Sequence, residues 1–395
     1  MKKNEKMICT RRTALLGIAS VVAEIAGCGG GSSGIAGLSG GGTGSFTSGT
    51  ITGFGSIIVN GIRYNNDTAT VLTSDDSVSS NQALQLGMVV NIEGSSVTPA
   101  SSPTGLATAT AYRITYGSEW LGPVSNRGVT TFEILGHTVD ILASTIFGGA
   151  VQQFADLTDA HFVEVYGYVD QVDGHIQASR IEVTTVQPLA YRLSGALTNI
   201  NLNTGTANLG QTAIFWSVPA LLPSGLLSGD FVRVVLDPSI VGSTWSATRI
   251  QLVSSPLPNL PSDRDYEAEI HGSITAYRSS ADFVINGIPV NASAAQITGT
   301  LAVGVQVEVE GFIRSGQLVA SKVDVKTASQ IETEEFEFYG VVSNVTAQTF
   351  VVRGETFYYD SNTANRDLLA RTPLPYVEVK ARRANGQWQA FEIDI

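Results

Sequence analysis

Short segments in which apolar and polar residues alternate recur along the chain. They lie at residues 89–94, 162–167, 231–236, 306–311 and 376–381. A period of two is typical of a β-strand with one buried face. The segments follow one another at intervals of roughly 70 residues, which is the spacing of a small repeated domain. The pattern therefore predicts five copies of one β-unit, numbered here as repeats 1 to 5.

Two further blocks accompany each alternating segment in the same order. A closing strand follows it, at residues 111–114, 178–181, 247–250, 320–323 and 390–393. A glycine turn between two β-prone runs precedes it, at residues 60–61, 135–136, 209–210, 286–287 and 353–354. The pair is Asn-Gly in repeats 1 and 4, which favours a type I′ hairpin because both central residues of that turn need positive φ.

The order of elements within one unit predicts its fold. In repeat 1 a first strand at 51–54 leads to a hairpin (56–60 and 62–64), then a variable segment, a strand at 89–93 and a closing strand at 108–114. Residues 150–157 and 365–370 are the best candidates for a short helix in the variable segment. This order is typical of an OB-like barrel. We expect an all-β chain of about five tandem five-stranded OB-like barrels, with half-open β-sandwiches as the alternative.

Composition sets the borders of these units. The predicted parts are a signal peptide (1–27), a Gly/Ser-rich tether (28–47), repeats at 48–116, 117–187, 188–254, 266–330 and 331–395, and a proline-rich spacer (255–265). The tether has too few large apolar residues to offset ordering entropy. Proline fixes φ and removes donors, so the spacer is expected to be semi-rigid. We expect repeats 1–3 and repeats 4–5 to form two groups.

The repeated blocks resemble a bacterial family known as the domain of unknown function number 5666. The resemblance rests on residues 53–61 and 86–94 of repeat 1 and on 283–287 and 305–323 of repeat 4. Repeat 3 departs most, with Leu236 where repeats 1, 2 and 4 have glycine, and repeat 5 has Ala381 there. The resemblance implies export and a β-rich, OB-like fold in tandem copies. It implies no activity and supplies no catalytic residues.

The N-terminus reads as an export signal. A basic start precedes an apolar run at 14–23, which is too short to span a bilayer, and Ile25-Ala26-Gly27-Cys28 follows. This last motif resembles the bacterial lipobox, which implies diacylglycerol on the Cys28 thiol and cleavage before it. An ordinary secretory signal is the alternative. The adjacent Arg11 and Arg12 resemble a twin-arginine signal, which leaves both export routes open.

Charge and cysteine content disfavour several classes of partner and of site. The net charge is −12, and removal of the leader, with five basic and two acidic residues, makes it −15. Such a chain is a poor candidate for nucleic acid, whose binding is driven by Lys and Arg. Both cysteines, Cys9 and Cys28, lie in the first 28 residues, so the repeats have neither a disulfide nor a cysteine metal site. Gly29 after the cysteine favours the outer membrane in a Gram-negative host.

The search for chemistry gives few candidates, and we expect no catalytic, cofactor-binding or metal residues. The four histidines (His137, His161, His175 and His271) lack zinc-site spacing and are interpreted as solvated turn residues. Acidic turns at 75–76, 170–174 and 332–337 lack the ligand count of an EF-hand, which leaves Ca²⁺ a minor alternative. Trp120, Trp216, Tyr358 and Tyr359 are weak candidates for stacking a glycan, with a core role as the alternative.

Together these features predict an exported, lipid-anchored protein of the cell envelope without enzymatic activity. Its repeats would act as a binding or spacer module. The expected partners are the membrane, through the lipid on Cys28, and a glycan or an envelope protein. An envelope hydrolase with a site between repeats is one alternative, and a structural or assembly factor is another.

Overall fold

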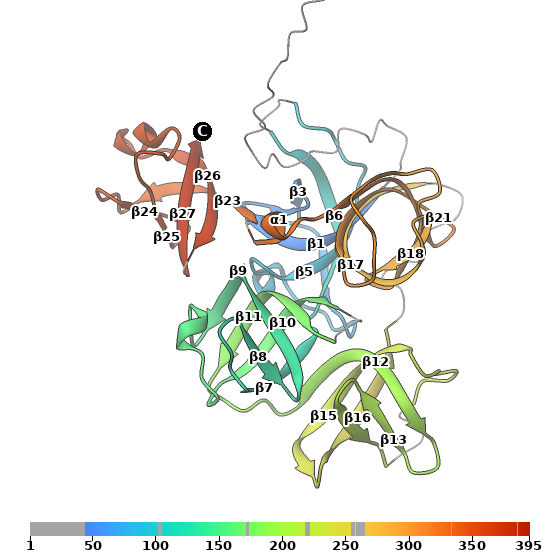
Figure 1. Cartoon of the computed structure of the whole chain (residues 1–395). Helices are drawn as coiled ribbons and strands as arrows, with labels where there is room; N and C mark the ends of the chain where they lie inside the picture. The colour runs from blue at the N-terminus through green and yellow to red at the C-terminus, as the bar shows by residue number, and fades with distance from the viewer. Residues whose placement is uncertain are drawn as a thin grey trace, which may run out of the picture. The chain divides into compact units, whose positions relative to one another are not determined.

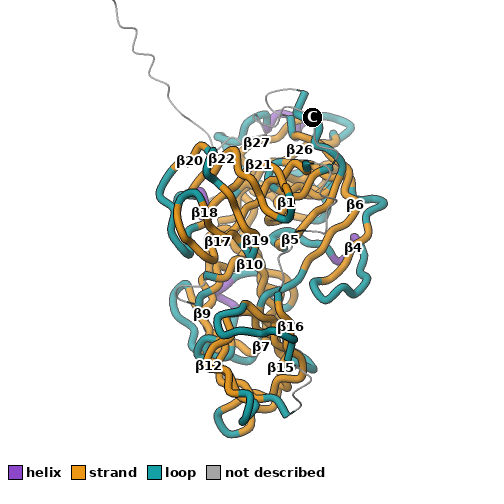
Figure 2. The backbone as a smooth tube through the Cα atoms, turned by 90° about the vertical axis from the view of Figure 1, so that its right-hand side faces the viewer, coloured by secondary structure: helices purple, strands orange, loops and turns teal. Residues whose placement is uncertain are grey.

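A computed structural model describes residues 44–101, 105–170, 174–217, 222–253, 257, 265–332, 334–384 and 386–395. The described chain is almost all β-strand (Figure 2), and its α-helical content is the single turn α1 (Ala328–Glu332). None of its described helices is long and apolar enough to cross a membrane. The predicted signal peptide, Cys28, the tether up to residue 43 and most of the proline-rich spacer lie outside the described residues.

Repeat 1 is a closed β-barrel. Its strands are β1 (Ser45–Phe54), β2 (Ile57–Val59), β3 (Ile62–Asn65), the short β4 (Thr70–Thr73), β5 (Val89–Gly94) and β6 (Ala107–Tyr116). Antiparallel pairs join β1 to β2, β2 to β3, β5 to β6 and β1 to β5, and a parallel pair joins β3 to β6. The ring therefore closes in the strand order of an OB barrel.

The other four repeats close in the same order, each as its own barrel along the colour ramp of Figure 1. Repeat 2 has β7 (Trp120–Ser125), β8 (Thr131–Ile134), β9 (His137–Gly149), β10 (Phe162–Val169) and β11 (Ile176–Thr184). Repeat 3 has β12 (Tyr191–Asn201), β13 (Thr206–Leu209), β14 (Thr212–Phe215), β15 (Phe231–Val241) and β16 (Thr244–Leu252). Repeat 4 has β17 (Tyr266–Ser279), β18 (Asp282–Ile285), β19 (Ile288–Asn291), β20 (Gln296–Thr298), β21 (Gln306–Arg314) and β22 (Gln317–Val325). Repeat 5 has β23 (Glu335–Ser343), β24 (Thr349–Val352), β25 (Glu355–Tyr358), β26 (Tyr376–Ala384) and β27 (Gln387–Asp394).

The predicted elements are confirmed, with small shifts in their borders. Both predicted helices exist as short 3-10 turns, η2 (Phe154–Asp156) and η4 (Arg366–Ala370), and repeat 1 has a third, η1 (Asn81–Ala83). Strand β1 begins at Ser45, so residues 45–47 belong to repeat 1 and not to the tether. The Ser/Thr-rich composition hides this end of the strand, since Phe46 is its one large apolar residue, yet Ser45, Phe46 and Thr47 are all buried.

Strand β1 also joins repeats that are far apart in the sequence. Residues 45–48 pair in parallel with residues 267–270 of β17, and Gly53 and Phe54 pair with Glu337 and Phe338 of β23. Repeats 1 and 5 share one hydrophobic cluster, repeats 2 and 3 share a second, and repeat 4 with Phe46 forms a third. The expected division into repeats 1–3 and 4–5 is therefore wrong, since repeat 1 pairs with repeats 4 and 5.

A glycine in the first strand lies against the residue that opens the hairpin turn in repeats 1, 2, 4 and 5. In repeat 1 the turn residue Asn60 has φ 51° and donates from Nδ2 to the carbonyl of Ser48 at 3.0 Å. A Cβ atom on the next residue, Gly49, would lie 2.1 Å from Oδ1 of Asn60. Glycine is therefore needed there, because the turn side chain folds back onto the strand.

Repeat 4 uses the same arrangement. Asn286 has φ 47° and donates from Nδ2 to the carbonyl of His271 at 3.3 Å, and a Cβ on Gly272 would lie 2.0 Å from that nitrogen. The corresponding pairs of glycine and turn residue are Gly122 with Leu135 and Gly340 with Arg353. Repeat 3 differs, because Gly210 opens its turn and Gly195 instead lies against Leu209, the last residue of β13. This glycine is a fourth recurring position, and in repeats 1, 2, 4 and 5 it faces the side chain of the turn residue.

Candidate functional site

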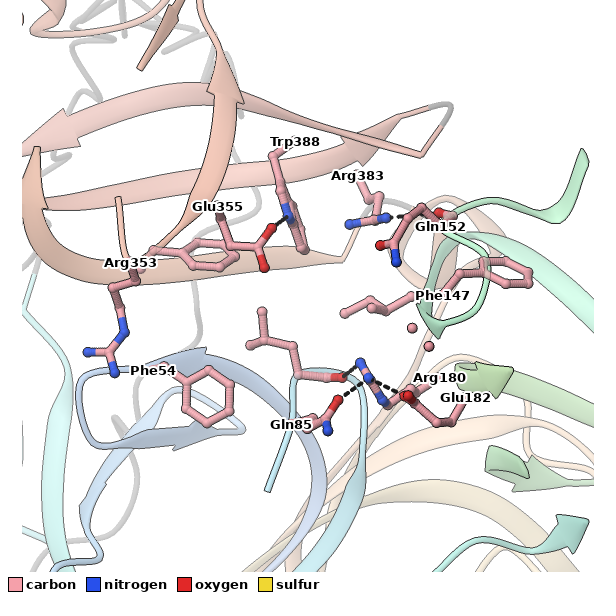
Figure 3. A pocket seen from close by; sticks show the side chains of 15 residues that line it. Phe54, Gln85, Phe147, Gln152, Arg180, Glu182, Arg353, Glu355, Arg383 and Trp388 are labelled. Atoms are coloured by element: carbon pink, nitrogen blue, oxygen red, sulfur yellow. Dashed lines mark hydrogen bonds and ion pairs between the residues drawn. The ribbon is translucent and has the colours of Figure 1, made fainter. Parts of the chain in front are cut away.

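A cavity of about 430 Å³ lies where repeats 1, 2 and 5 meet (Figure 3). Its volume falls within the range of about 300–1,000 Å³ that is typical of small-molecule sites. Its charged lining consists of three arginines and two glutamates: Arg180, Arg353, Arg383, Glu182 and Glu355. The lining thus has a net charge of +1, whereas the whole chain has a net charge of −12.

Arg180 on β11 fixes the junction between repeats 1 and 2. Its guanidinium donates to the carbonyl of Leu86 at 3.1 Å and to the amide oxygen of Gln85, and forms an ion pair with Glu182 at 2.5 Å. The residue is only 6 % exposed, and its Nε has no hydrogen-bond partner in the described chain. A Cβ on Gly148 of β9 would lie 2.3 Å from this guanidinium, so glycine provides the space for it.

Arg383 on β26 approaches the cavity from repeat 5. It donates to the carbonyl of Gln152 of repeat 2 at 3.2 Å and lies over the ring of Trp388, 4.8 Å from its centre. Burial lowers the pKa of Arg383, and the positive charge of Arg180 acts in the same direction against the opposite effect of Glu355. Two guanidinium groups are thus held near each other in a half-buried place, which is unfavourable unless negative charge is shared between them.

Arg353 opens the hairpin turn between β24 and β25, the position that asparagine has in repeats 1 and 4. Its φ is 53°, in the left-handed region that asparagine tolerates better than arginine does. Its Nη1 donates to the carbonyl of Tyr339 at 3.4 Å, the residue before Gly340, as Asn60 and Asn286 do in their repeats. Arg353 and Arg383 form no ion pair with any described residue.

Acceptors and rings complete the cavity. Oε2 of Glu355 accepts a hydrogen bond from the indole nitrogen of Trp388 at 3.1 Å. The rings of Phe54, Phe147 and Phe338 add apolar surface. Guanidinium donors, carboxylate and amide acceptors, and aromatic faces can together bind a small polar ligand.

A second, smaller hollow of about 320 Å³ lies between repeat 2 and α1. Asp140 of β9 lines it and accepts from Nδ1 of His175 at 3.1 Å, with both side chains about one-third exposed. A histidine oriented by a carboxylate is one part of many hydrolytic sites. Among the described residues, no group of three or more His, Cys, Asp or Glu side chains could hold a metal ion.

Ionisable side chains are also buried where repeat 4 meets its neighbours. Burial, and then the negative charge of Glu308, raise the pKa of Glu269 well above its usual value. Neither carboxylate oxygen of Glu269 meets a donor in the described residues, which disfavours its charged form in the same direction. Lys326 pairs with Glu308, and the ring of His271 lies 5.3 Å from that of Tyr168 of repeat 2.

The four aromatic residues predicted to stack a ligand are not gathered at the cavity. Trp120 and Trp216 are 0 % and 4 % exposed and lie in the core shared by repeats 2 and 3, so they are core residues and not ligand contacts. The indole nitrogen of Trp120 donates to the carbonyl of Ser194 at 2.9 Å. Tyr358 and Tyr359 are half-buried on or beside β25, and the described lining of the cavity does not include them.

Two histidines differ from the interpretation as solvated turn residues. His137 is buried where repeats 2 and 3 meet, with Nε2 3.0 Å from Oγ1 of Thr212, and burial lowers its pKa. His271 lies within β17, and burial lowers its pKa to about 4. Contacts between repeats bury both residues, and such contacts leave no mark in the pattern of a single repeat.

The sequence analysis missed the three arginines of the cavity. Arg180 stands in the closing-strand block, where Arg249 of repeat 3 occupies the same position at the surface. One signal was present: Arg353-Gly354 replaces the Asn-Gly of repeats 1 and 4, and a residue in a strained backbone conformation is a reason to look for function.

The fold defines a chain of five closed OB-type barrels with a ligand-sized cavity between three of them. A domain of unknown function, DUF5666, matches residues 47–98, 122–182, 271–324 and 339–394, which together cover more than half of the chain. The chain therefore belongs to the DUF5666 family, and the resemblance seen in the sequence is confirmed. The four ranges lie in repeats 1, 2, 4 and 5, so repeat 3 keeps the barrel without matching the family sequence.

Other comparisons add little. No curated protein matches the chain. A solved structure described as drosophila Unr CSD456 is 14 % identical, with 53 % of this chain and 97 % of that chain covered and a TM-score of 0.13. A likeness with so low a TM-score supports no conclusion about fold or function.

Proposed function

We propose that this protein is a non-enzymatic binding module of the cell envelope, exported and held to a membrane by a lipid on Cys28. The cavity between repeats 1, 2 and 5 carries the binding part of the proposal. A simple spacer would need only a stiff row of barrels. Here residues from three repeats, distant in sequence, surround one ligand-sized space with charged and aromatic side chains.

The membrane part of the proposal rests on the N-terminal sequence. Cys28 follows Ile25-Ala26-Gly27 after a basic start and a short apolar run, and Gly29-Gly30-Gly31 follows it. A lipid-anchored domain needs such a flexible tether. In a Gram-negative host, we expect the outer membrane to be the site of attachment.

Lipidation is tested by labelling cells that express the full chain with radioactive palmitate. We expect Cys28→Ser to lose the label and to leave the membrane fraction, because the thiol that accepts diacylglycerol is gone. Cys9→Ser is the matched control and should keep both, since Cys9 lies within the leader. Equal labelling of the Cys28→Ser variant would show that the anchor has been assigned wrongly.

A hydrolase is the second candidate, because His175 and Asp140 form a hydrogen-bonded pair beside the hollow next to α1. A base oriented by an acid is the first requirement of acyl transfer. Turnover of ester or glycoside substrates by the purified chain, abolished by His175→Asn, would favour this candidate over the binding module.

A further inference from the structure

The side chains that line the cavity between repeats 1, 2 and 5 indicate which class of ligand it binds. We infer that it binds a sugar acid or a sugar phosphate, a small ligand with several hydroxyl groups whose single anionic group is attracted by Arg353 and Arg383. The inference rests on the proposed binding function and specifies its ligand class.

The charges of the cavity favour an anion. Glu182 forms an ion pair with Arg180. Glu355 accepts from the indole of Trp388 and its charge also acts on Arg383, so one of the two positive charges of Arg353 and Arg383 remains without a matching carboxylate in the lining. Figure 3 shows these two arginines on either side of Glu355 and Trp388. A guanidinium binds carboxylate and phosphate with two parallel hydrogen bonds, which gives both strength and orientation.

The guanidinium of Arg353 is only partly engaged by the protein. Asparagine would satisfy the carbonyl of Tyr339 as Asn60 and Asn286 satisfy theirs, and would adopt the left-handed conformation at lower cost. Arginine makes the same bond through Nη1, so its other nitrogens are left for a ligand. Leu135 of repeat 2 has the same left-handed conformation, with φ 51°, so it is the guanidinium group and not the backbone that sets Arg353 apart from the other turn residues.

The rest of the lining fits the neutral part of a sugar. The carboxylates of Glu182 and Glu355 and the amides of Gln85 and Gln152 can accept hydrogen bonds from hydroxyl groups. Phe54, Phe147 and Phe338 offer apolar surface for the C–H face of a pyranose ring. An inorganic anion has no C–H face to lie against these rings.

The test is calorimetric titration of the mature full chain in detergent with four probes: glucuronate, glucose 6-phosphate, glucose and inorganic phosphate. We expect glucuronate or glucose 6-phosphate to bind at least about tenfold more tightly than glucose or phosphate. Glucose has no anionic group for the arginines, and phosphate has no sugar ring for the rest of the lining. Which of the two anionic sugars binds better identifies carboxylate or phosphate as the source of the charge.

Arg353→Asn separates binding from folding. It should leave the thermal melting temperature unchanged or higher and weaken binding of the preferred probe by about tenfold or more. Arg383→Gln should weaken binding similarly. Arg278→Gln, an exposed arginine of repeat 4, is the control and should bind as the wild type does.

Three results would overturn the inference: no binding of either anionic sugar, equal binding of glucose, or unchanged affinity in a folded Arg353→Asn variant. Phosphate binding as tightly as glucose 6-phosphate would reduce the cavity to a general anion site and refute the sugar class. Tight binding of glucose alone would refute the anion class but leave the proposed binding function in place.

Discussion

At the scale of single residues, buried ionisable groups link the stability of this protein to pH. Burial raises the pKa of both Glu334 and Glu337 to about 7, and at Glu337 the neighbouring Glu378 adds to the effect. The folded chain therefore keeps protons that the unfolded chain loses above about pH 4.5, so stability falls as pH rises from 4.5 to 7. His271, whose pKa is lowered to about 4, acts in the opposite direction between pH 4 and 6.5.

Glu334→Gln should flatten this pH dependence. The neutral amide of the variant has no proton to lose. The free energy of unfolding of the variant should therefore rise relative to that of the wild type as pH goes from 5 to 8, by up to about 3 kcal/mol, because the wild-type pKa is raised to about 7. Thermal melts at pH 5, 6.5 and 8 measure the difference. Glu133→Gln, on the accessible part of β8, is the control, and identical slopes for wild type and Glu334→Gln would contradict the assignment.

At the scale of elements, the alternating strands, the Asn-Gly hairpins and both short helices were predictable because each depends on neighbours in the sequence. The parallel pairing of β1 with β17 and β23 was not, since strands of different repeats have the same pattern and nothing local selects a partner. Leu236 shows a further limit: it replaces glycine without disturbing the barrel and is fully buried in the core of repeat 3.

The glycine of the first strand leads to a prediction at this scale. Gly272→Ala should destabilise repeat 4 by about 2 kcal/mol, because its Cβ would displace Asn286 and break that side chain's bonds to the backbone at His271 and Ser273. Hydrogen exchange of β17 and β18 measures the loss. Gly195→Ala is the matched control.

Gly195 occupies the same position in repeat 3, but there the nearest atom to an added Cβ is 3.5 Å away, an ordinary contact with Leu209. We expect Gly195→Ala to exchange as the wild type does. Equal destabilisation of repeats 3 and 4 by the two variants would mean that the clash with Asn286 does not govern this position, because the loss of glycine's backbone freedom alone should stabilise a strand.

At the scale of the whole molecule, the cavity is a property of the assembled repeats. Its lining comes from repeats 1, 2 and 5, so it exists only where those barrels are docked. Hydrogen bonds join repeat 2 to repeat 1 beside the cavity. Arg180 donates to Gln85 and to the carbonyl of Leu86, and the hydroxyl of Ser179 donates to the carbonyl of Gly87 at 2.7 Å. A ligand in the cavity would therefore stabilise the junction as well as fill it.

The repeats offer a test of this docking by comparison of equivalent residues. Arg180 and Arg249 occupy the same position in the closing strands of repeats 2 and 3, so the sequence pattern treats them alike. Both side chains reach another repeat, but that of Arg180 is 7 % exposed and pairs closely, whereas that of Arg249 is 49 % exposed and lies 3.9 Å from Asp75 of repeat 1. A surface ion pair of that kind contributes little to stability.

Arg180→Met should therefore loosen the junction, whereas Arg249→Met should be nearly neutral. Without the guanidinium, the carbonyl of Leu86 and the carboxylate of Glu182 lose their donor in a half-buried place, at a cost of about 2–4 kcal/mol. Because a chain of five barrels need not unfold in one step, hydrogen exchange of each segment is the proper measurement. We expect faster exchange at residues 84–88 and in β11 and unchanged protection in β12 to β16, and equal effects of the two substitutions would show that Arg180 does not hold the repeats together.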